Sequence, residues 1–462
     1  MNLPARLGFI IWFFSSLSSL NSQKSYSKSE NIRLSVSKKT KVLWCGDIVA
    51  MTGFARVTEN VINRLKDDFE IVVLGHNWWG DPCEQQKDFK IYPSSNRFQT
   101  APFGEQRIRE VVEREQPDIV FTINDMWIIN EQYRQIQDLH QQGKFKFVGY
   151  APMDSYGWIG CLADTANDWD AIISYTEFGA HEFVKGGIQK PIAVIPHGVT
   201  PGQFYPMDKK EARRKLGLDE DLFIVFNGNR NQFRKRIDIT IKAFAEFAVG
   251  RPETRLYLHM GLKDQGWDVM GVFGREMSRA GLDPNGRIIM TSQTEGPPNV
   301  SVDMLNTIYN ACDVGVNTCK GEGWGLVNFE HAACGVPQVV PDHTSCKEIF
   351  EGYGELIRCD HIDVDTNYAR EMPCPSSEHL VEILDHLYTY PDICDKIGQQ
   401  CYQRVTDPQF SWDTVASQFG GIFEDVMNQV DHSVSVEIDE QPKKPKKKRR
   451  KSPKRELAGS LG

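Results

Sequence analysis

The stretch "DVGVNTCKGEGWGLVNFEHAACGVPQVV", residues 313–340, decides the fold. It reads as an apolar strand, a glycine-rich loop, a helix and a second apolar strand. Two strands that are joined through a helix lie parallel in one sheet, because a tight turn cannot connect parallel strands. The stretch therefore predicts one unit of a doubly wound α/β domain.

Similar units extend in both directions along the chain. Apolar strands that alternate with helices predict a parallel sheet with both faces covered. The segment 200–218 combines proline, glycine and charge, and it reads as a linker with an entry helix. Two such domains in tandem face a central cleft, with ligands at the carboxyl ends of the strands. The expected strands are KVLWCG, EIVVLG, DIVFTIND, FKFVGYAPMD, DAIISYT and IAVIPHGV in the first domain, and LFIVFNGN, RLYLHMG, RIIMTS, DVGVNT and PQVVPD in the second.

The composition is that of an ordinary soluble protein of two or three domains, with 40% hydrophobic and 25% charged residues. The 11 cysteines are scattered without a CxxC pair, which predicts reduced thiols and no disulfide framework or zinc site. The net charge is −9, and ten basic residues lie between Lys443 and Arg455. The rest of the chain therefore carries about −19, with 43 basic against 62 acidic residues, which argues against a nucleic-acid-binding body.

The two ends of the chain differ from its middle. Residues 1–39 contain an apolar run that resembles a signal-peptide core but is short for a membrane span. A cleaved signal, a weak signal anchor, an organellar presequence and a misassigned start all remain open. We expect a cytoplasmic protein, with a membrane-peripheral or signal-anchored form as the alternative. Residues 433–462 form a basic tail that cannot pack a core and is expected to be disordered, and a nuclear address, a polyanion contact and a solubilising role stay open for it.

Two glutamates flank the glycine-rich loop. Gly323 and Gly325 let the backbone approach a ligand closely, and the helix that starts there directs unpaired N–H groups at an anion. Glu330 lies five residues into this helix, roughly 7.5 Å along its axis, within reach of a ribose attached to that anion. Glu322 precedes the turn and faces the other side, where a transferred sugar would lie. Either acid alone reads as solvated or as favoured by the helix dipole, but the pair around the turn indicates a nucleotide site.

Four cations follow the strand LFIVFNGN, namely Arg230, Arg234, Lys235 and Arg236. Positive charges this close together at the end of a buried strand repel one another unless they share an anion. A diphosphate leaving group fits that requirement and needs no metal ion. A solvated basic face is the alternative interpretation.

These motifs together resemble those of retaining nucleotide-sugar glycosyltransferases with the GT-B fold, close to the family 4 group. The family's Glu–seven residues–Glu element matches Glu322 and Glu330. Its "GR…K" phosphate element, with Arg and Lys five apart, matches Gly228, Arg230 and Lys235. The resemblance implies two Rossmann-like α/β domains, with the nucleotide sugar on the second.

The resemblance runs from about Lys41 to Gln429 and includes the hinge segment "IPHGVTPGQFYP", in which His197 replaces the family's Asn. In the first domain, "MTGFARVTENV" resembles the family's glycine loop, where Gly53 lets the loop approach donor or acceptor. The family often carries a histidine after a middle strand of this domain. This chain has Asp154 in that region, so the donor sugar and the acceptor stay open.

The resemblance implies the retaining transfer of a sugar from a nucleoside diphosphate to a hydroxyl of a glycan, a lipid or a small molecule. The nucleotide sugar is then a co-substrate, and neither a cofactor nor a metal is expected. The implied catalytic residue is Glu322, and Asp154 is a second candidate that would hold a sugar hydroxyl, deprotonate the acceptor or only cap the next helix. The implied donor-binding residues are Gly53, Arg230, Lys235, Gly323, Trp324, Gly325, Leu326 and Glu330.

Three other functions of the same fold are alternatives to this transfer. A nucleotide-sugar epimerase would need no acceptor. A phosphorylase would need a pyridoxal lysine site that the sequence does not offer, and a non-catalytic GT-B scaffold would bind a polyanion through its tail. The DWD motif, 168–170, imitates a metal-binding DxD but precedes a strand and reads as a turn. The expected boundaries are 40–200 for the acceptor-side domain, 201–405 for the donor domain and 406–432 for a C-terminal helix.

Overall fold

The computed structural model describes residues 38–50, 52–96, 100–158, 162–200, 202–365 and 368–429. The N-terminal apolar segment and the basic tail lie outside these residues, so their roles stay predictions. The described residues from Lys39 onward belong to one compact unit that holds both sheets. Among them, no helix combines the length and the apolar character that crossing a membrane requires.

Seven parallel strands form the sheet of the first domain, in the order β3-β2-β1-β4-β5-β6-β7. Alternate residues of β1 point to opposite faces, so that Val42 and Trp44 pack on α1 while Leu43 and Cys45 pack toward α2, α3 and α5. The strands are β1 (Lys41–Gly46), β2 (Glu70–Gly75), β3 (Lys90–Pro93), β4 (Ile119–Ile123), β5 (Lys146–Ala151), β6 (Ala171–Ser174) and β7 (Ile192–Val194). The helices are α1 (Gly53–Leu65), α2 (Ile108–Glu115), α3 (Met126–Arg134), α4 (Gln137–Gln141) and α5 (Glu177–Lys185), with short 3-10 turns η1 (Glu84–Lys87) and η2 (Ala166–Asp168).

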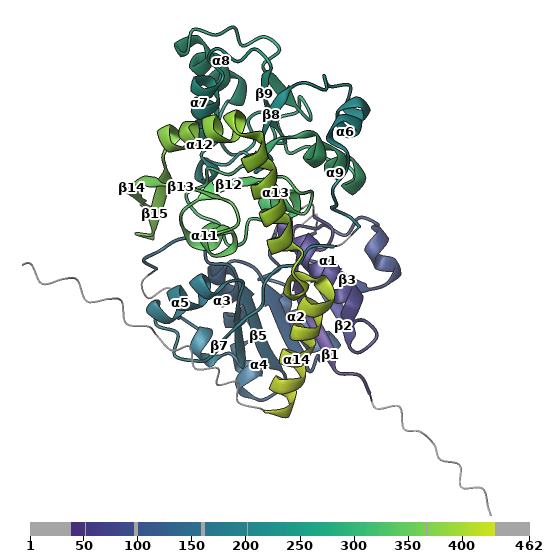
Figure 1. Cartoon of the computed structure of the whole chain (residues 1–462). Coiled ribbons are helices and arrows are strands. Elements are labelled where there is room, and N and C mark those ends of the chain that lie inside the picture. The colour runs from purple at the N-terminus through teal and green to yellow at the C-terminus, as the bar shows by residue number, and fades with distance from the viewer. Residues whose placement is uncertain are drawn as a thin grey trace, which may run out of the picture. The chain divides into compact units, whose positions relative to one another are not determined.

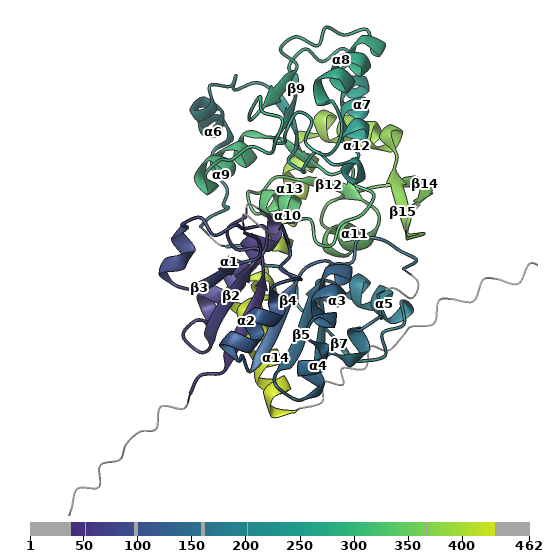
Figure 2. The ribbon, with the colours of Figure 1, turned by 180° about the vertical axis from the view of Figure 1, so that it is seen from behind.

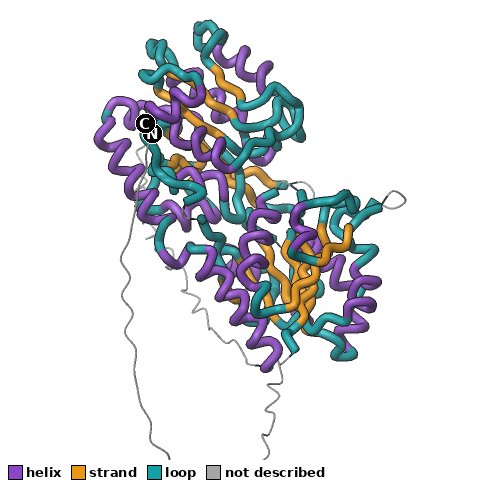
Figure 3. Tube along the Cα trace, turned by 90° about the vertical axis from the view of Figure 1, so that its right-hand side faces the viewer, coloured by secondary structure: helices purple, strands orange, loops and turns teal. Residues whose placement is uncertain are grey.

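Six parallel strands form the second sheet, in the order β10-β9-β8-β11-β12-β13 (Figure 3, orange). The strands are β8 (Phe223–Asn227), β9 (Thr254–Leu258), β10 (Ile288–Met290), β11 (Val314–Val316), β12 (Gln338–Pro341) and β13 (Glu355–Ile357). The helices are α6 (Lys209–Leu216), α7 (Ile237–Phe247), α8 (Val269–Arg279), α9 (Val302–Ala311), α10 (Leu326–Ala332), α11 (Thr344–Phe350), α12 (Ser377–Thr389) and α13 (Pro391–Val405), with 3-10 turns η3 (Phe233–Lys235) and η4 (Pro408–Phe410). The predicted pair of Rossmann-like parallel sheets is confirmed, and every strand expected from the sequence is present.

Both sheets reverse their strand order at one place, between β1 and β4 in the first domain and between β8 and β11 in the second. Connections leave the sheet in opposite directions there, which opens a crevice outside the carboxyl ends of the strands where doubly wound proteins bind ligands. The glycine-rich loop, here residues 317–325, follows β11, and the four cations follow β8. The predicted site residues therefore lie at the switch point of the second sheet.

The last helix, α14 (Trp412–Asn428), returns to the first domain (Figure 1). Its Phe419 packs against Trp44 and Phe121, with ring centres 6.1 and 5.6 Å away, and Phe423 packs against Phe69 at 5.6 Å. Ser411 caps the helix by accepting a hydrogen bond from the Thr414 N–H. The predicted amphipathic C-terminal helix is thus present, and it completes the core of the first domain.

A two-stranded hairpin outside both main sheets was not expected from the sequence (Figure 2). It consists of β14 (Cys359–Val364) and β15 (Glu371–Pro375), which run antiparallel. Its strands mix charged, proline and apolar residues without a steady alternation, so no period indicates a strand.

Candidate functional site

The glycine-rich loop lies directly against the first domain. At Gly321 a Cβ atom would stand 1.7 Å from the carbonyl oxygen of Asp154, and at Gly323 it would stand 2.5 Å from Cβ of Pro152. Any side chain at these two positions would separate the loops. The sequence analysis expected a ligand to approach the backbone of this loop closely. In the structure, the segment after β5 makes that close approach and brings Asp154 to the loop.

The end of the loop turns into α10 at Gly325, whose φ of 91° lies in the left-handed region that favours glycine. The Trp324 side chain before it is buried and packs against Phe329 and Phe410, with ring centres 5.2 and 5.8 Å away. The Trp324 carbonyl accepts a hydrogen bond from Ser345 at 3.2 Å. A donor contact at Trp324 would consequently come from its backbone, since the indole belongs to the interior.

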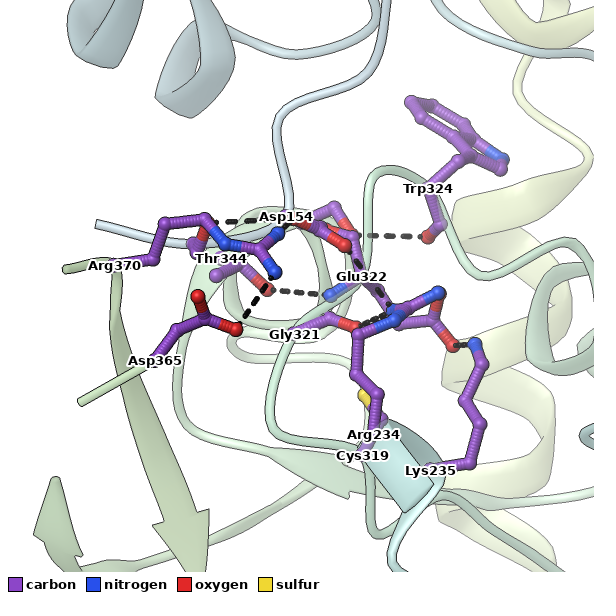
Figure 4. Close-up of polar contacts among 12 residues, drawn as sticks. Asp154, Arg234, Lys235, Cys319, Gly321, Glu322, Trp324, Thr344, Asp365 and Arg370 are labelled. Carbon is purple, nitrogen blue, oxygen red and sulfur yellow. Dashed lines mark hydrogen bonds and ion pairs between the residues drawn. The ribbon is translucent and has the colours of Figure 1, made fainter. Parts of the chain in front are cut away.

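Glu322 is buried with two cations against its carboxylate (Figure 4). Lys235 Nζ contacts Oε1, and Arg234 Nη1 lies 3.8 Å from Oε2. Asn317 donates a hydrogen bond to Oε1 at 3.2 Å, and the Ser345 hydroxyl donates to the Glu322 carbonyl at 2.8 Å. Burial alone would raise the pKa of Glu322, but the charges of Lys235 and Arg234 outweigh it, so the pKa is lowered. The carboxylate is therefore ionised and fixed in place.

Each of the four cations after β8 has a carboxylate of the chain beside it. Arg230 forms a two-pronged pair with Asp264 at 2.7 and 3.1 Å and is 46% exposed. Repulsion among these cations therefore does not by itself require an external anion, because carboxylates of the chain pair with them, and a diphosphate shared by these cations stays a prediction. The structure brings Arg234, and not Arg230, to Glu322. The pairs are Arg230–Asp264, Arg234–Glu322, Lys235–Glu322 and Arg236–Asp238.

Glu330 also meets the first domain, although it belongs to α10 of the second. Arg56 of α1 places Nη1 3.1 Å from Oε1 of Glu330, and the Tyr309 hydroxyl hydrogen-bonds the same carboxylate. Burial raises the pKa of Glu330 to about 7, against the opposing effects of Arg56 and Tyr309. Gly53 lies against Leu326, whose Cδ1 would be 3.2 Å from a Cβ at that position. The carboxylate predicted to hold a ribose is bound to Arg56 in this structure.

Asp154 lies between two arginines of the second domain (Figure 4). Arg234 Nη1 is 3.4 Å from Oδ2, and Arg370 Nη1 is 3.6 Å from Oδ1. No helix begins in the described residues 155–158, so Asp154 does not cap the next helix there. The structure thus brings Asp154, Glu322 and Lys235 into one network of alternating charge, with Arg234 at its centre.

Sequence reasoning missed Asp125, which follows β4 on the first-domain side of the switch point. Its side chain stays exposed to water and does not cap α3, although it occupies the N-cap position. Crowding by surrounding protein and the charge of Asp154 raise the pKa of Asp125 to about 6, while Arg234 and Arg370 lower it. The strand-end position in DIVFTIND was the signal that could have identified it. Arg56 and Arg370 were also missed, because only the tertiary structure brings them to the site.

Candidate metal ligands have other partners. In the DWD motif, Asp170 accepts hydrogen bonds from Lys146 at 3.0 Å and from the Phe147 N–H at 2.8 Å, at the N-terminal end of β6. The interpretation of this motif as structural is confirmed. Within the described residues, His361, Asp363 and Cys374 form one group with metal-ligand geometry. Lys320 Nζ lies 2.9 Å from Asp363, and Arg236 Nη1 lies 2.6 Å from the Cys374 sulfur, so cations already occupy two of the three ligand atoms.

Each of the two domains matches a sequence model of a glycosyltransferase family. The sequence model of Glycosyltransferase Family 4 matches residues 51–203, and a model described as glycosyl transferase-like matches residues 273–420. A D-inositol 3-phosphate glycosyltransferase of Geodermatophilus obscurus is 30% identical over 174 residues, which cover 37% of each chain. A protein of the same name from Thermobispora bispora is 24% identical over 272 residues, covering 58% of each chain. The chain spans between 31% and 58% of the length of the curated relatives that it matches.

Solved structures share the fold across nearly their whole length. Sucrose-phosphate synthase from Thermosynechococcus elongatus aligns with a TM-score of 0.65 and 17% identity, over 85% of this chain and 100% of that one. HepE of Anabaena, in complex with UDP and glucose, aligns with a TM-score of 0.62 and 16% identity, over 83% of this chain and 99% of that one. At these identities the likeness shows the fold alone.

Proposed function

Because this chain belongs to the family 4-like glycosyltransferases of the GT-B fold, we propose that it moves a sugar from a nucleoside diphosphate to an acceptor hydroxyl with retention of the anomeric configuration. One observation carries the proposal. The buried, ionised Glu322 is held by Lys235 and Arg234 at the switch point of the second sheet, and Asp154 of the first domain faces it. Such a carboxylate between facing domains is suited to a reaction in which positive charge develops on a sugar ring.

The donor side of the proposal rests on charge. Arg234 and Lys235 would form charge-assisted bonds to the diphosphate and stabilise it as it leaves, so no metal ion is required. The backbone N–H groups of residues 323–326 would assist. Glu330 would accept hydrogen bonds from the ribose hydroxyls once Arg56 moves aside. A structural neighbour has been solved with UDP-glucose, which supports a nucleotide sugar as the donor class.

The chemical step follows from these positions. The bond between the anomeric carbon and the diphosphate oxygen breaks, the acceptor oxygen bonds to the same carbon from the same face, and the hydroxyl proton leaves with the diphosphate. Glu322, kept ionised by two cations, stabilises the positive charge at the ring more in the transition state than in the bound donor. Asp154 would hold the incoming hydroxyl.

The acceptor side offers carboxylates and aromatic surface. Asp125 and Asp154 follow the neighbouring strands β4 and β5. Trp127 is 49% exposed and meets Phe103 edge to face, with ring centres 6.0 Å apart. Carboxylates accept hydrogen bonds from hydroxyls, and an exposed indole packs on the apolar face of a ring. These groups fit a polyhydroxylated acceptor, such as a carbohydrate or a cyclic polyol.

A two-stage experiment tests the proposal. The purified protein is first screened against nucleotide sugars for thermal stabilisation, since bound donor raises the melting temperature by mass action. Donors that stabilise are then incubated with polyol and sugar acceptors, and the anomeric configuration of the product is read by NMR. We expect acceptor-dependent nucleoside diphosphate release, a retained configuration and no loss of rate with chelator. Donor isomerisation without acceptor would favour an epimerase, and donor binding without turnover would favour a scaffold.

A further inference from the structure

The β14–β15 hairpin belongs to the second domain in sequence but contacts the first. The Tyr156 N–H donates to the Glu371 carbonyl at 3.0 Å, and the Glu371 N–H donates back at 2.9 Å, as an antiparallel bridge. Arg370, the residue before Glu371, lies over the ring of Trp158 with its Cζ 5.0 Å from the ring centre. The hairpin is therefore attached to the segment that follows β5 and carries Asp154.

The Arg370 side chain is fixed by the turn of its own hairpin. Its Nη2 lies 3.2 Å from Oδ2 of Asp365, and the Asp365 N–H donates to the Arg370 carbonyl at 2.8 Å. Tyr368 stacks on Trp158 with ring centres 5.6 Å apart, and its own ring centre lies 5.8 Å from Cζ of Arg370, so the two rings and the guanidinium pack against one another. A second guanidinium nitrogen, Nη1, is directed at Asp154 (Figure 4).

The two arginines beside Asp154 attract it without using up its oxygens. Arg370 and Arg234 lie 3.6 and 3.4 Å from the carboxylate, beyond ordinary hydrogen-bond length but close enough for strong charge attraction. The Ser155 hydroxyl donates to Oδ1 at 3.3 Å, whereas Oδ2 accepts no hydrogen bond from the described residues. Oδ2 is thus held at the reaction centre with its lone pairs available for a donor such as a hydroxyl.

We propose that Arg370 is a positioning residue of the reaction centre, which holds the Asp154 carboxylate so that one oxygen receives the acceptor hydroxyl. This inference rests on the proposed sugar transfer. It makes the hairpin a part of the acceptor site, although its sequence lies within the donor domain. A purely structural hairpin would need only the backbone bridge between Tyr156 and Glu371, which the charge of Arg370 does not affect.

The variants separate the effect of the Arg370 charge from the structural role of the hairpin. Arg370→Gln removes the charge and keeps the size, while Arg370→Lys keeps the charge. Arg358→Gln is the matched control, because Arg358 lies at the base of the same hairpin and pairs only loosely with Asp360, at 3.5 Å. Nucleoside diphosphate binding by calorimetry, melting temperature, and kcat and KM for the acceptor are measured for all three.

We expect Arg370→Gln to lower kcat/KM for the acceptor by roughly 10- to 100-fold, with nucleoside diphosphate affinity and melting temperature close to those of the wild type. Arg370→Lys should recover part of the rate, and Arg358→Gln should match the wild type. A rate for Arg370→Gln within about threefold of wild type would overturn the inference. A parallel loss of nucleotide affinity and of melting temperature would also overturn it, because that pattern belongs to a structural hairpin.

The pH profile gives an independent measurement. Asp125 faces Asp154, Arg234, Arg370 and the Tyr175 hydroxyl, and Arg370 is one of the two cations that lower its pKa. Removing Arg370 therefore raises the pKa of Asp125, and the acid limb of the rate should move to higher pH in Arg370→Gln. A wild-type protein that transfers no sugar from any donor would instead contradict the proposed function, so the two failures are distinguishable.

Discussion

Glu322 and Glu330 are the same residue type, and both are buried, yet their surroundings give them opposite protonation behaviour. Two cations hold the pKa of Glu322 below its usual value despite burial. Glu330 has one arginine and a tyrosine hydroxyl, which do not compensate for burial, and its pKa rises to about 7. A carboxylate that must face positive charge is thus kept ionised, while the one assigned to a neutral ribose is close to half protonated at neutral pH.

Glu322→Gln tests the charge at the sugar. The substitution keeps the size and the contact to Lys235 but removes the negative charge. We expect donor affinity within a few-fold of wild type and a loss of about 2 kcal/mol or more of transition-state stabilisation, roughly 30-fold in kcat. Glu330→Ala should instead raise KM for the donor, because bonding at the ribose changes little during the reaction. If both substitutions raised KM equally and left kcat unchanged, Glu322 and Glu330 would only bind the donor, and Glu322 would have no catalytic role.

The raised pKa of Glu330 predicts how stability changes with pH. The folded state binds a proton at Glu330 up to about pH 7, whereas the unfolded chain releases it near the ordinary glutamate pKa of 4.5. This group therefore stabilises the fold fully below about pH 4.5, and the contribution is lost as the pH rises through 7, by up to about 3 kcal/mol. The melting temperature of wild type relative to Glu330→Gln should fall between pH 5 and pH 8. A difference that does not depend on pH would refute the assignment.

Arg230 and Arg234 carry the same charge four positions apart, but only Arg234 contacts the network at Glu322. We expect Arg234→Ala and Lys235→Ala to slow transfer by roughly 10- to 100-fold, because each loses a charge-assisted bond to the leaving diphosphate. Arg230→Ala is the matched comparison, and its rate should stay within a few-fold of wild type. The measurement is the steady-state transfer rate of each variant at saturating acceptor. A large loss for Arg230 alone would restore the assignment made from the family motif.

At the scale of elements, α14 joins the end of the chain to the first domain. Phe419 packs among Trp44, Phe121 and Tyr150, which come from three adjacent strands of the first sheet. The helix covers the face of the sheet that α1 also covers. The core of the first domain is therefore incomplete until the last helix has been synthesised.

Phe419→Ala measures that contribution. Removing a buried ring leaves a cavity and costs about 3–5 kcal/mol. The melting temperature of the first domain should fall by at least about 5 °C. Met427→Ala on the same helix is the control, since Met427 is 39% exposed and should change the melting temperature little. Equal, small shifts for both variants would mean that α14 is only loosely attached.

At the scale of the whole molecule, side chains from each domain complete the site of the other. Arg56 of the first domain binds Glu330 of the second, and Arg234 of the second contacts Asp154 of the first. A ribose at Glu330 would have to share the carboxylate with Arg56, which already contacts Oε1. Donor binding should therefore be coupled to a change in the contact between the domains.

Removing residues 1–37 and 434–462 tests whether the described body functions alone. Both sheets, their helices and every proposed site residue lie between these segments. The trimmed protein should keep its melting temperature and its transfer rate. A lower melting temperature after removal of the basic tail alone would show that the tail contributes to the fold.

The sequence by itself determined the two parallel sheets, because strand and helix periods are local properties of a few consecutive residues. It also determined that Glu322, Glu330 and Lys235 stand near one site, since each follows a strand of the same sheet or begins the next helix. The sequence did not predict the hairpin at residues 359–375, because its strands mix charged, proline and apolar residues without a steady alternation.

Only the tertiary structure decided which charges meet. Arg230 pairs with Asp264 and not with Glu322. Arg56 of the first domain contacts Glu330 of the second, and Arg370 lies beside Asp154. A charge acts through space over several ångströms, and its partner is set by the packing of loops far apart in the chain. The family motif therefore gave the residue types of the site, and the folded chain gave their partners.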